Sequence, residues 1–231
     1  MRDYRLLIFD WDGTLVDSIQ RIVDSMRFAA EGCQLPWRDD AAIRGIIGLG
    51  LPEAVSSLYP DLQDLRCIER FRRLYSERYL VLESTPSPLY CGVAEALDAF
   101  REAGYLLAVA TGKSRRGLDA VLAGRDWQGF FDITRCADES ASKPDPLMLH
   151  QILASCGVAP DQALMVGDSV FDLRMAHNAG VDAVAVGYGA QPLWLLREEQ
   201  PRLAIESFGE LAAWLGQGAV RLSEEVGDCV E

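Results

Sequence analysis

Short apolar runs recur along the chain and predict the strands of a buried sheet. They lie at residues 6–9, 105–110, 133–136, 163–166, 183–186 and, more weakly, 203–205. From residue 92 onward they alternate with segments in which apolar side chains recur every three or four residues, the spacing of one helix face. Strands that alternate with helices form parallel sheets covered on both faces. We therefore expect an α/β fold with a Rossmann-like, three-layer α/β/α core built on a parallel sheet.

The segment between the first two predicted strands breaks this alternation. Residues 18–31 and 61–82 have the spacing of amphipathic helices, and no strand pattern separates them. A stiff connector with two prolines follows. We expect residues 16–88 to form an inserted helical cap domain, with residues 1–15 and 89–231 forming the core domain. The alternative is a helical layer packed directly on the core.

Composition narrows the class of protein. The formal net charge of −13, with only two lysines among the 22 Lys and Arg residues, argues against a nucleic-acid-binding surface. No apolar run reaches the ~18 to 20 residues of a membrane-spanning helix, and we expect no signal peptide before the first strand. The six cysteines are scattered, without paired or metal-binding spacing, which indicates free thiols in the cytoplasm. We expect the acidic tail from Gly216 to be loosely held.

Two carboxylates follow the first predicted strand. Asp10 and Asp12 are two residues apart, so in an extended segment their side chains point the same way. Carboxylates this close repel one another unless a cation lies between them or one of them is protonated. The pair therefore predicts either a metal site or a nucleophile beside a general acid.

Polar residues also follow the later strands. Thr111 and Gly112 follow the second strand, Asp168 follows the fourth with Asp172 a turn later, and Lys143 precedes a helix. Because ligands bind outside the carboxyl ends of parallel strands, we expect these groups to converge on one rim. Such a set suits phosphoryl transfer through an aspartyl phosphate, which needs a carboxylate nucleophile and oxygen ligands for Mg²⁺. A hydroxyl, backbone amides and a lysine stabilise charge on the transferred group.

Four ordered motifs carry a family resemblance. They are Asp-Trp-Asp-Gly-Thr-Leu-Val-Asp from residue 10, Ala-Thr-Gly-Lys from residue 110, Ser-Lys-Pro-Asp-Pro from residue 142 and Val-Gly-Asp-Ser-Val-Phe-Asp from residue 166. Together they resemble the motifs of the haloacid dehalogenase superfamily. The chain most resembles the phosphoglycolate-phosphatase-like branch, which carries a helical cap between the first and second motifs. The similarity runs from residue 4 to near residue 215 and is specific for the superfamily rather than for a substrate.

The resemblance implies a role for each carboxylate. Asp10 would be the nucleophile, with its other oxygen on Mg²⁺. Asp12 would be the general acid and base, and its backbone carbonyl would also face the metal. Asp168 would complete the metal site, and Asp172 would bind through water or support the ligands. Trp11, where the family usually has Phe or Leu, should point away from the carboxylates.

The same resemblance implies how the substrate is held. Thr111 and Gly112 would bind the phosphoryl oxygens, and Lys143 would neutralise the nucleophile and the phosphate. Lys113 sits at the same rim, where it either contacts the substrate or is an ordinary surface charge. Arg44 is the cap's candidate for touching the substrate.

Three local features have structural interpretations. Asp17, followed three residues later by Gln20, predicts the N-cap of the first cap helix. Ser169 predicts the cap of the helix that carries Asp172. The glycines of residues 45–50 predict a tight turn of the cap that faces the site.

The expected function is that of a Mg²⁺-dependent phosphatase of a small phosphomonoester. A haloacid dehalogenase on the same fold is an alternative, although related dehalogenases lack an acid at the position of Asp12. A phosphonate hydrolase would need a cap lysine, and residues 16–90 contain none. A phosphomutase shares Asp10 and Asp12 and stays open. A phospho-Asp signalling module is disfavoured, because no Asp directly ends the second or third predicted strand.

The substrate stays undetermined at this level. Phosphoglycolate, a sugar phosphate and a nucleotide monophosphate all suit the predicted chemistry. We expect a small-molecule partner, with no nucleic acid and no membrane, and a monomer or homodimer.

Overall fold

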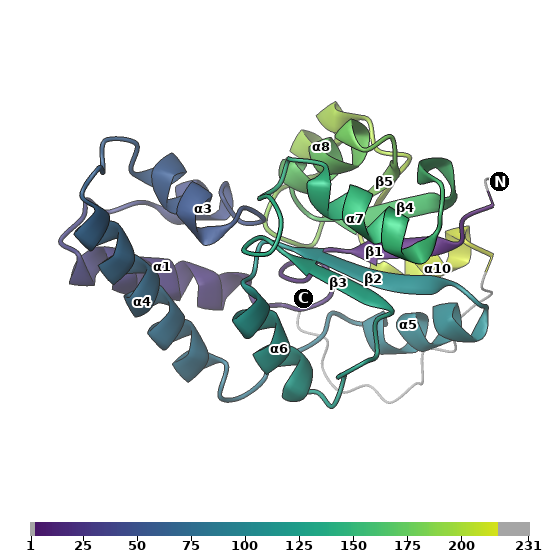
Figure 1. Cartoon of the computed structure of the whole chain (residues 1–231), viewed down its shortest axis with the longest axis horizontal. Helices are drawn as coiled ribbons and strands as arrows, with labels where there is room; N and C mark the ends of the chain where they lie inside the picture. The colour runs from purple at the N-terminus through teal and green to yellow at the C-terminus, as the bar shows by residue number, and fades with distance from the viewer. Residues whose placement is uncertain (1–2, 217–231) are drawn as a thin grey trace.

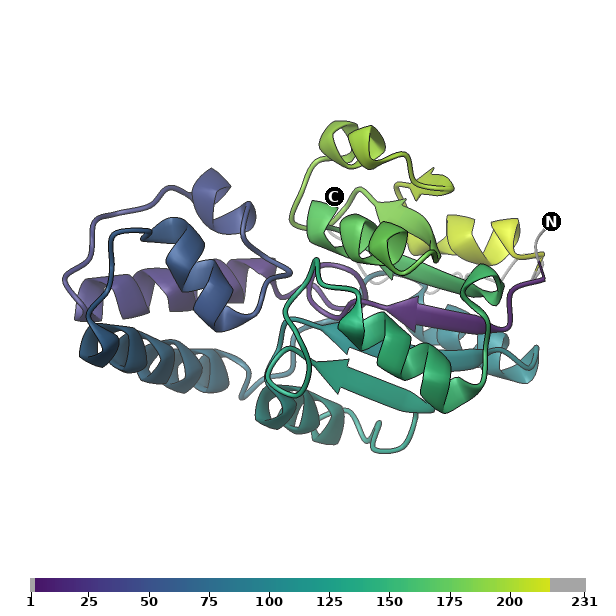
Figure 2. The same ribbon diagram turned by 45° about the horizontal axis from the view of Figure 1, so that its top comes forward.

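A computed structural model describes residues 3–216, which contain a six-stranded parallel sheet with helices packed around it (Figures 1 and 2). Neighbouring strands are parallel, and their spatial order is β3-β2-β1-β4-β5-β6. The strands are β1 (Leu6–Phe9), β2 (Leu106–Thr111), β3 (Ile133–Cys136), β4 (Ala163–Gly167), β5 (Asp182–Val186) and β6 (Leu203–Ile205). Each matches a predicted apolar run to within one residue at either end, so the predicted parallel sheet is confirmed.

Helices cover both faces of this sheet. Side chains alternate along β1, so Leu7 and Phe9 face one helical layer and Leu6 and Ile8 face the other. The first layer contains α5 (Val93–Glu102), α6 (Arg115–Ala123) and α10 (Phe208–Trp214). The second contains α7 (Leu147–Cys156), α8 (Val170–Asn178) and α9 (Leu193–Leu196), with short 3-10 turns at Pro160–Gln162 and Arg197–Glu199. The predicted Rossmann-like, three-layer architecture is confirmed.

Four further helices come between β1 and α5 and lie together at one side of the sheet (Figures 1 and 2). They are α1 (Ile19–Gly32), α2 (Asp40–Arg44), α3 (Leu51–Leu58) and α4 (Leu65–Leu82), and we call residues 19–82 the helical insert. Buried side chains such as Val23, Ile47, Val55 and Phe71 give the insert an apolar core of its own. Apart from Ala190, the buried members of this cluster lie between residues 19 and 79, so the four helices pack mainly on one another.

The two long helices of the insert match the predicted ones, and the two short ones were not predicted. α4 begins at Leu65 rather than at residue 61, because the Asp64 side chain accepts a hydrogen bond from the amide of Arg66 and caps the helix there. α2 and α3 are too short to show several turns of apolar periodicity, which is the signal on which the prediction depends.

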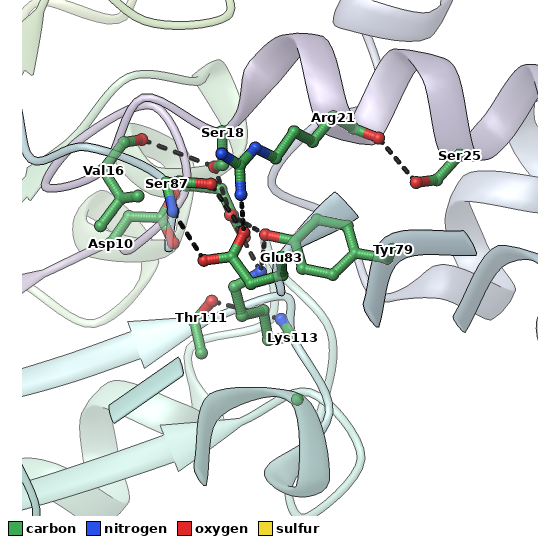
Figure 3. Close-up of polar contacts among 12 residues, drawn as sticks. Asp10, Val16, Ser18, Arg21, Ser25, Tyr79, Glu83, Ser87, Thr111 and Lys113 are labelled. Carbon is green, nitrogen blue, oxygen red and sulfur yellow. Dashed lines mark hydrogen bonds and ion pairs between the residues drawn. The ribbon is translucent and has the colours of Figure 1, made fainter. Parts of the chain in front are cut away.

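The connections between the insert and the sheet run side by side. The backbone amide of Asp17, in the outgoing connection, donates to the carbonyl of Pro88 in the returning one (2.9 Å). Glu83 accepts hydrogen bonds from Arg21 (2.9 Å) and from the hydroxyl of Ser87 (2.6 Å), as drawn in Figure 3. These contacts tie the end of α4 to the start of α1 where the insert meets the sheet.

The strand order reverses at β1, which lies between β2 and β4. Ligands of open parallel sheets bind outside the carboxyl ends of the strands at such a point. The helical insert follows β1 in the sequence, and it lies at the carboxyl end of this strand (Figure 2). Within residues 3–216, no helix combines the length and the apolar character needed to cross a bilayer. The tail that we expect to be loosely held falls at residues 217–231, outside the described residues.

Candidate active site

Asp10 is the first residue after β1, and its amide still pairs with the sheet by donating to the carbonyl of Val166 (2.9 Å). One oxygen of its carboxylate lies 2.6 Å from the Nζ atom of Lys143. The same Nζ atom lies 2.6 Å from a carboxylate oxygen of Asp172, and all three side chains are at most 2% exposed. Lys143 therefore links two acids that come from distant segments of the chain.

Asp168 completes a cluster of three buried acids. One carboxylate oxygen each from Asp10, Asp168 and Asp172 lies within 4.8 Å of the others. Burial raises the pKa of Asp10 to about 7 against the opposing charge of Lys143, and the charge of Asp172 adds to the rise. Burial and then the charges of Asp10 and Asp172 hold the pKa of Asp168 well above its ordinary value.

Lys143 keeps its charge in this pocket. Burial alone would lower the pKa of its ammonium group, but the carboxylates of Asp10 and Asp172 outweigh burial and the net direction is upward. A fixed positive charge beside Asp10 can attract an anionic group to that carboxylate and stabilise charge that develops there.

Backbone and hydroxyl donors fix the other two acids. Asp168 accepts from the amide of Ala190 (2.7 Å) and from the hydroxyl of Thr14 (3.2 Å). The hydroxyl of Ser169 donates to Asp172 (2.6 Å), and the two residues form the capping box of α8. The prediction that Ser169 caps this helix is confirmed. Each carboxylate is thereby held in one orientation.

The three acids suit a hard divalent cation. Mg²⁺ prefers oxygen ligands and is usually bound by one or two carboxylates together with water. When all three acids of the cluster are ionised, they carry two more negative charges than Lys143 offsets, which is the charge of one divalent ion. Gly13, with φ +81°, and Gly189 both lie so close to Asp168 that a Cβ atom at either position would collide with its carboxylate. The residues present therefore fit the predicted Mg²⁺ site.

The carboxylate of Asp12 lies outside this cluster and has its own partners. Its Oδ1 atom accepts from the hydroxyl of Ser18 (2.5 Å) and lies 3.0 Å from the Nζ atom of Lys113. The hydroxyl of Tyr79, from α4 of the insert, lies 3.5 Å from the same oxygen. Figure 3 shows the side chains of Ser18, Tyr79 and Lys113 near one another. The expected contact of the Asp12 backbone carbonyl with the metal stays a prediction.

The predicted N-cap at Asp17 is wrong. Ser18 occupies the N-cap position of α1, but its side chain makes no capping hydrogen bond. The Ser18 hydroxyl instead donates to the buried Asp12 carboxylate, a stronger acceptor than a neutral group. Asp17 lies one residue too early to cap the helix, and its carboxylate accepts a long hydrogen bond from Tyr90 (3.5 Å).

Thr111 ends β2, and Gly112 follows it at the rim. The Thr111 side chain is fully buried, and its hydroxyl oxygen accepts from the amide of Lys113 (3.2 Å). Accepting this bond leaves the hydroxyl hydrogen free to donate to another oxygen. Thr111 and Gly112 thus lie beside the acids, at the carboxyl end of the strand next to β1.

The glycine-rich turn of the insert packs against this rim. A Cβ atom at Gly112 would lie 2.5 Å from the carbonyl oxygen of Leu49 and 2.7 Å from that of Gly48, so a side chain does not fit there. The amide of Gly50 donates to the hydroxyl of Ser142 (2.8 Å), beside Lys143. The turn at residues 45–50 faces the site, as the sequence predicts.

The two cationic substrate candidates have different surroundings. The Lys113 side chain is only 9% exposed and is held between Asp12 and Tyr79, so it is not a solvated surface charge. Arg44 lies half-buried at the end of α2, and within residues 3–216 it has no hydrogen bond or ion pair with the acids. Burial raises the pKa of the Tyr90 phenol, and the charge of Arg44 opposes that rise. The structure therefore brings Lys113, and not Arg44, to Asp12.

Trp11 points away from the acids, as predicted. It is fully buried in the apolar layer on the α5 side of the sheet. Its ring packs edge-on against those of Trp127 (6.2 Å between centroids) and Phe131 (6.3 Å). A large aromatic side chain at this position therefore serves packing.

Sequence reasoning missed Ser18 and Tyr79. Tyr79 belongs to the apolar stripe of α4, where an aromatic residue predicts core packing, and it is indeed 8% exposed. Burial, followed by the charges of Asp12 and Glu83, raises the pKa of its phenol well above the ordinary value, so it stays a neutral hydroxyl. The only signal in the sequence is that two positions of this otherwise apolar stripe, Tyr75 and Tyr79, carry hydroxyl groups.

Comparisons with known proteins show the family of the chain. Residues 7–186 match the family model described as haloacid dehalogenase-like hydrolase. The chain is 33% identical over 211 residues to a protein of Dickeya dadantii named "probable phosphatase IndB". The alignment covers 89% of this chain and 91% of that protein. It is 31% identical over 220 residues to the phosphoglycolate phosphatase of Mesorhizobium japonicum, covering 94% of this chain and 96% of that protein.

A solved structure shares the same architecture. It is a hydrolase of the haloacid dehalogenase-like family from Streptococcus pneumoniae, with a TM-score of 0.79 and 25% sequence identity, covering 92% of this chain and 99% of that one. The family model spans well over half of the chain, and both relatives are aligned over nearly their whole lengths. The chain therefore belongs to the haloacid dehalogenase-like hydrolase family and is one of its phosphatases.

Proposed function

We propose that the protein hydrolyses a small phosphomonoester with Mg²⁺, through an aspartyl phosphate formed on Asp10. The observation that carries this proposal is the buried contact between Lys143 and Asp10 within the three-acid cluster at the end of β1. An anionic nucleophile repels an anionic phosphate unless a cation lies beside it, and Lys143 supplies that cation. The net charge of −13 makes such a local positive charge more necessary.

The reaction has two halves. In the first, an oxygen of Asp10 attacks phosphorus, the bond from phosphorus to the leaving-group oxygen breaks, and Asp12 donates its proton to that oxygen. In the second, Asp12 takes a proton from water, the water oxygen attacks phosphorus, and the bond to Asp10 breaks to release phosphate. One residue can serve both halves because it ends the first half deprotonated, as the second half requires.

The remaining groups would hold the phosphate. Thr111 and Gly112 would donate hydrogen bonds to phosphoryl oxygens, and Lys143 would offset their charge. Asp10 and Asp168 would hold Mg²⁺ with the Asp12 backbone carbonyl, supported by Asp172. When bound, Mg²⁺ supplies positive charge for the phosphoryl oxygens.

We also propose that residues 16–88 act as a cap domain over a core domain of residues 1–15 and 89–231. The insert's own apolar core supports this division. The close approach of its turn to Gly112 supports a role in covering the site. A cover over the rim would exclude water while phosphate is transferred and would place residues of the insert beside the leaving group.

Phosphoglycolate is the first substrate to test, because one relative carries that activity in its name. Sugar phosphates and nucleotide monophosphates belong in the same panel. A phosphomutase would share Asp10 and Asp12, so conversion of a hexose 1-phosphate to its 6-phosphate is measured in parallel. Cys33, Cys67, Cys136 and Cys156 are free thiols, which supports a reducing cytoplasm. One chain supplies every group named here, so a monomer or a homodimer could act.

The test is a phosphate-release assay on this panel, with Mg²⁺ and with EDTA, on the wild type and Asp10→Asn. We expect Mg²⁺-dependent release that Asp10→Asn abolishes. In Asp12→Asn, intact-mass measurement should detect a slowly hydrolysed phosphoryl adduct after reaction with an activated aryl phosphate. Full activity in Asp10→Asn would sink the proposal, and halide release from a 2-haloacid would favour the dehalogenase.

A further inference from the structure

Tyr79 brings a hydroxyl from the insert into the polar centre of the sheet's rim. Its oxygen accepts a hydrogen bond from the Nζ atom of Lys113 (2.8 Å) and lies 3.5 Å from Oδ1 of Asp12. The Lys113 ammonium also lies 4.2 Å from the centre of the Tyr79 ring. A phenol that accepts from lysine still has its own hydrogen to direct at the carboxylate, so the three groups can be satisfied together.

The three groups come from separate parts of the fold. Asp12 follows β1 and Lys113 follows β2, so both are fixed to the sheet, whereas Tyr79 lies near the end of α4. Figure 3 shows the Tyr79 ring reaching from the insert toward Lys113. The contact therefore exists only while α4 lies against the rim.

We infer that Tyr79 is a positioning residue for the general acid and base, holding Lys113 against Asp12 when the insert lies on the sheet. This inference rests on the proposed function and adds a residue to it. Lys113 has a long flexible stem, and its ammonium can turn away from Asp12 unless a second group holds it. The Tyr79 hydroxyl and ring supply two further contacts, which reduce the orientations open to Lys113 and, through it, to the Asp12 carboxylate.

The positioning has a specific kinetic consequence. The leaving-group oxygen must come within hydrogen-bond reach of Asp12 to receive its proton. An alkoxide is a poor leaving group and needs that proton, whereas a nitrophenolate leaves readily without it. Misalignment of Asp12 should therefore slow transfer from an alkyl phosphate far more than transfer from an aryl phosphate. A general loosening of the fold would slow both to the same degree.

The experiment compares kcat/KM for p-nitrophenyl phosphate with kcat/KM for the best alkyl phosphate of the panel, in the wild type and Tyr79→Phe. Phe keeps the ring and removes only the hydroxyl. We expect kcat/KM to fall about tenfold for the alkyl phosphate and less than about twofold for the aryl phosphate. kcat/KM is the useful constant because it reports the steps up to phosphorylation of Asp10. Equal falls on the two substrates, or no fall on either, would overturn the inference.

Tyr59→Phe is the matched control. Tyr59 is also a buried tyrosine of the insert, and its hydroxyl donates to the carbonyl of Pro36 (3.1 Å), within the insert itself. We expect Tyr59→Phe to lower thermal stability by an amount similar to that in Tyr79→Phe and to leave both kcat/KM values unchanged. An equal preference for the aryl substrate in Tyr59→Phe would overturn the specific role of Tyr79.

A double-mutant cycle tests whether Tyr79 acts through Lys113. In a Lys113→Met background, Tyr79→Phe should change the alkyl phosphate rate by less than about twofold, because the group that it positions is gone. If the two substitutions lower the rate independently, their effects multiply and the inference fails. Wild-type turnover that is lost in Asp10→Asn establishes the proposed function separately, so failure here leaves that function standing.

Discussion

Lys143 and Asp10 form an ion pair closed off from solvent, with 2.6 Å between Nζ and Oδ1 and side-chain exposures of 0% and 2%. Breaking a buried pair by removing one partner costs about 3–5 kcal/mol, because the other charge is left uncompensated. Asp172 shares the same ammonium, so loss of Lys143 would leave two acids facing each other. We therefore expect the lysine to stabilise the packing of the site and, under the proposed function, to assist the approach of an anionic substrate.

Lys143→Met is expected to lower kcat at least about 100-fold and to destabilise the fold by about 3 kcal/mol at pH 8. Phosphate release and urea-induced unfolding measure the two effects. Arg174→Met is the control, because Arg174 is 51% exposed and its pair with Glu199 lies at the surface. That change should cost at most about 1 kcal/mol and leave kcat unchanged. Similar losses of kcat and of stability in Lys143→Met and Arg174→Met would show that the buried pair contributes no more than a surface pair.

Mg²⁺ binding should weaken as the pH falls, because metal ligands must be deprotonated. Burial raises the pKa of Asp10 to about 7 in the metal-free protein, so at pH 6 this acid is mostly protonated and at pH 8 mostly ionised. The dissociation constant for Mg²⁺ should rise about tenfold from pH 8 to pH 6, as measured by calorimetry. Asp17→Asn removes an exposed acid of the first motif and should keep the full pH dependence. A dissociation constant for Mg²⁺ that does not change between pH 8 and pH 6 would contradict the raised pKa of Asp10.

Without metal, Asp10 should make the fold less stable as the pH rises. Its pKa rises from the ordinary 3.8 to about 7 on folding, so between these values the folded state binds more protons than the unfolded state. Stability then falls as the pH increases through this window, because the proton that favours the folded state is lost. Asp10→Asn removes this ionisation, and Lys143 keeps a charged partner in Asp172, so its ammonium is not left uncompensated. The variant should therefore stabilise the metal-free protein at pH 8 by up to about 4 kcal/mol, with little effect at pH 4.

Urea unfolding in EDTA at the two pH values checks this expectation. Asp98→Asn, at an exposed position of α5, controls for the loss of one negative charge from an acidic protein. A gain in Asp98→Asn as large as that in Asp10→Asn would assign the effect to net charge rather than to burial.

The rim could be predicted because its residues follow apolar runs. Asp10, Thr111 and Asp168 each stand where a buried strand ends, and the ends of parallel strands meet along one edge. Lys143 ends no strand, so periodicity alone does not place it, and only the ordered motifs identify it. Fold class and chemistry therefore follow from different signals in the same chain.

The partners of Asp12 could not be predicted. Tyr79 is 67 residues from Asp12 in the sequence, and their contact depends on how α4 is placed against the sheet. The role of Ser18 was not predicted for a local reason. Asp17 and Ser18 both carry an oxygen suited to capping, and a motif cannot tell which one a buried carboxylate will claim. The errors therefore gather where the insert meets the sheet, since side-chain partners there depend on how the helices of the insert are placed against the sheet.

Gly112→Ala tests that meeting point directly. The new methyl group would meet the carbonyl oxygens of Leu49 and Gly48 at 2.5 and 2.7 Å, so the turn of the insert must move away from the rim. We expect kcat/KM to fall at least about tenfold, because small displacements of substrate-positioning groups are costly. Hydrogen exchange at residues 45–50 should quicken while exchange in the sheet stays the same. Gly209→Ala, on α10 where a Cβ atom meets nothing within 4 Å, should leave activity unchanged and stability equal or slightly higher. Unaltered exchange at residues 45–50 in Gly112→Ala would mean that the turn does not depend on this contact for its position.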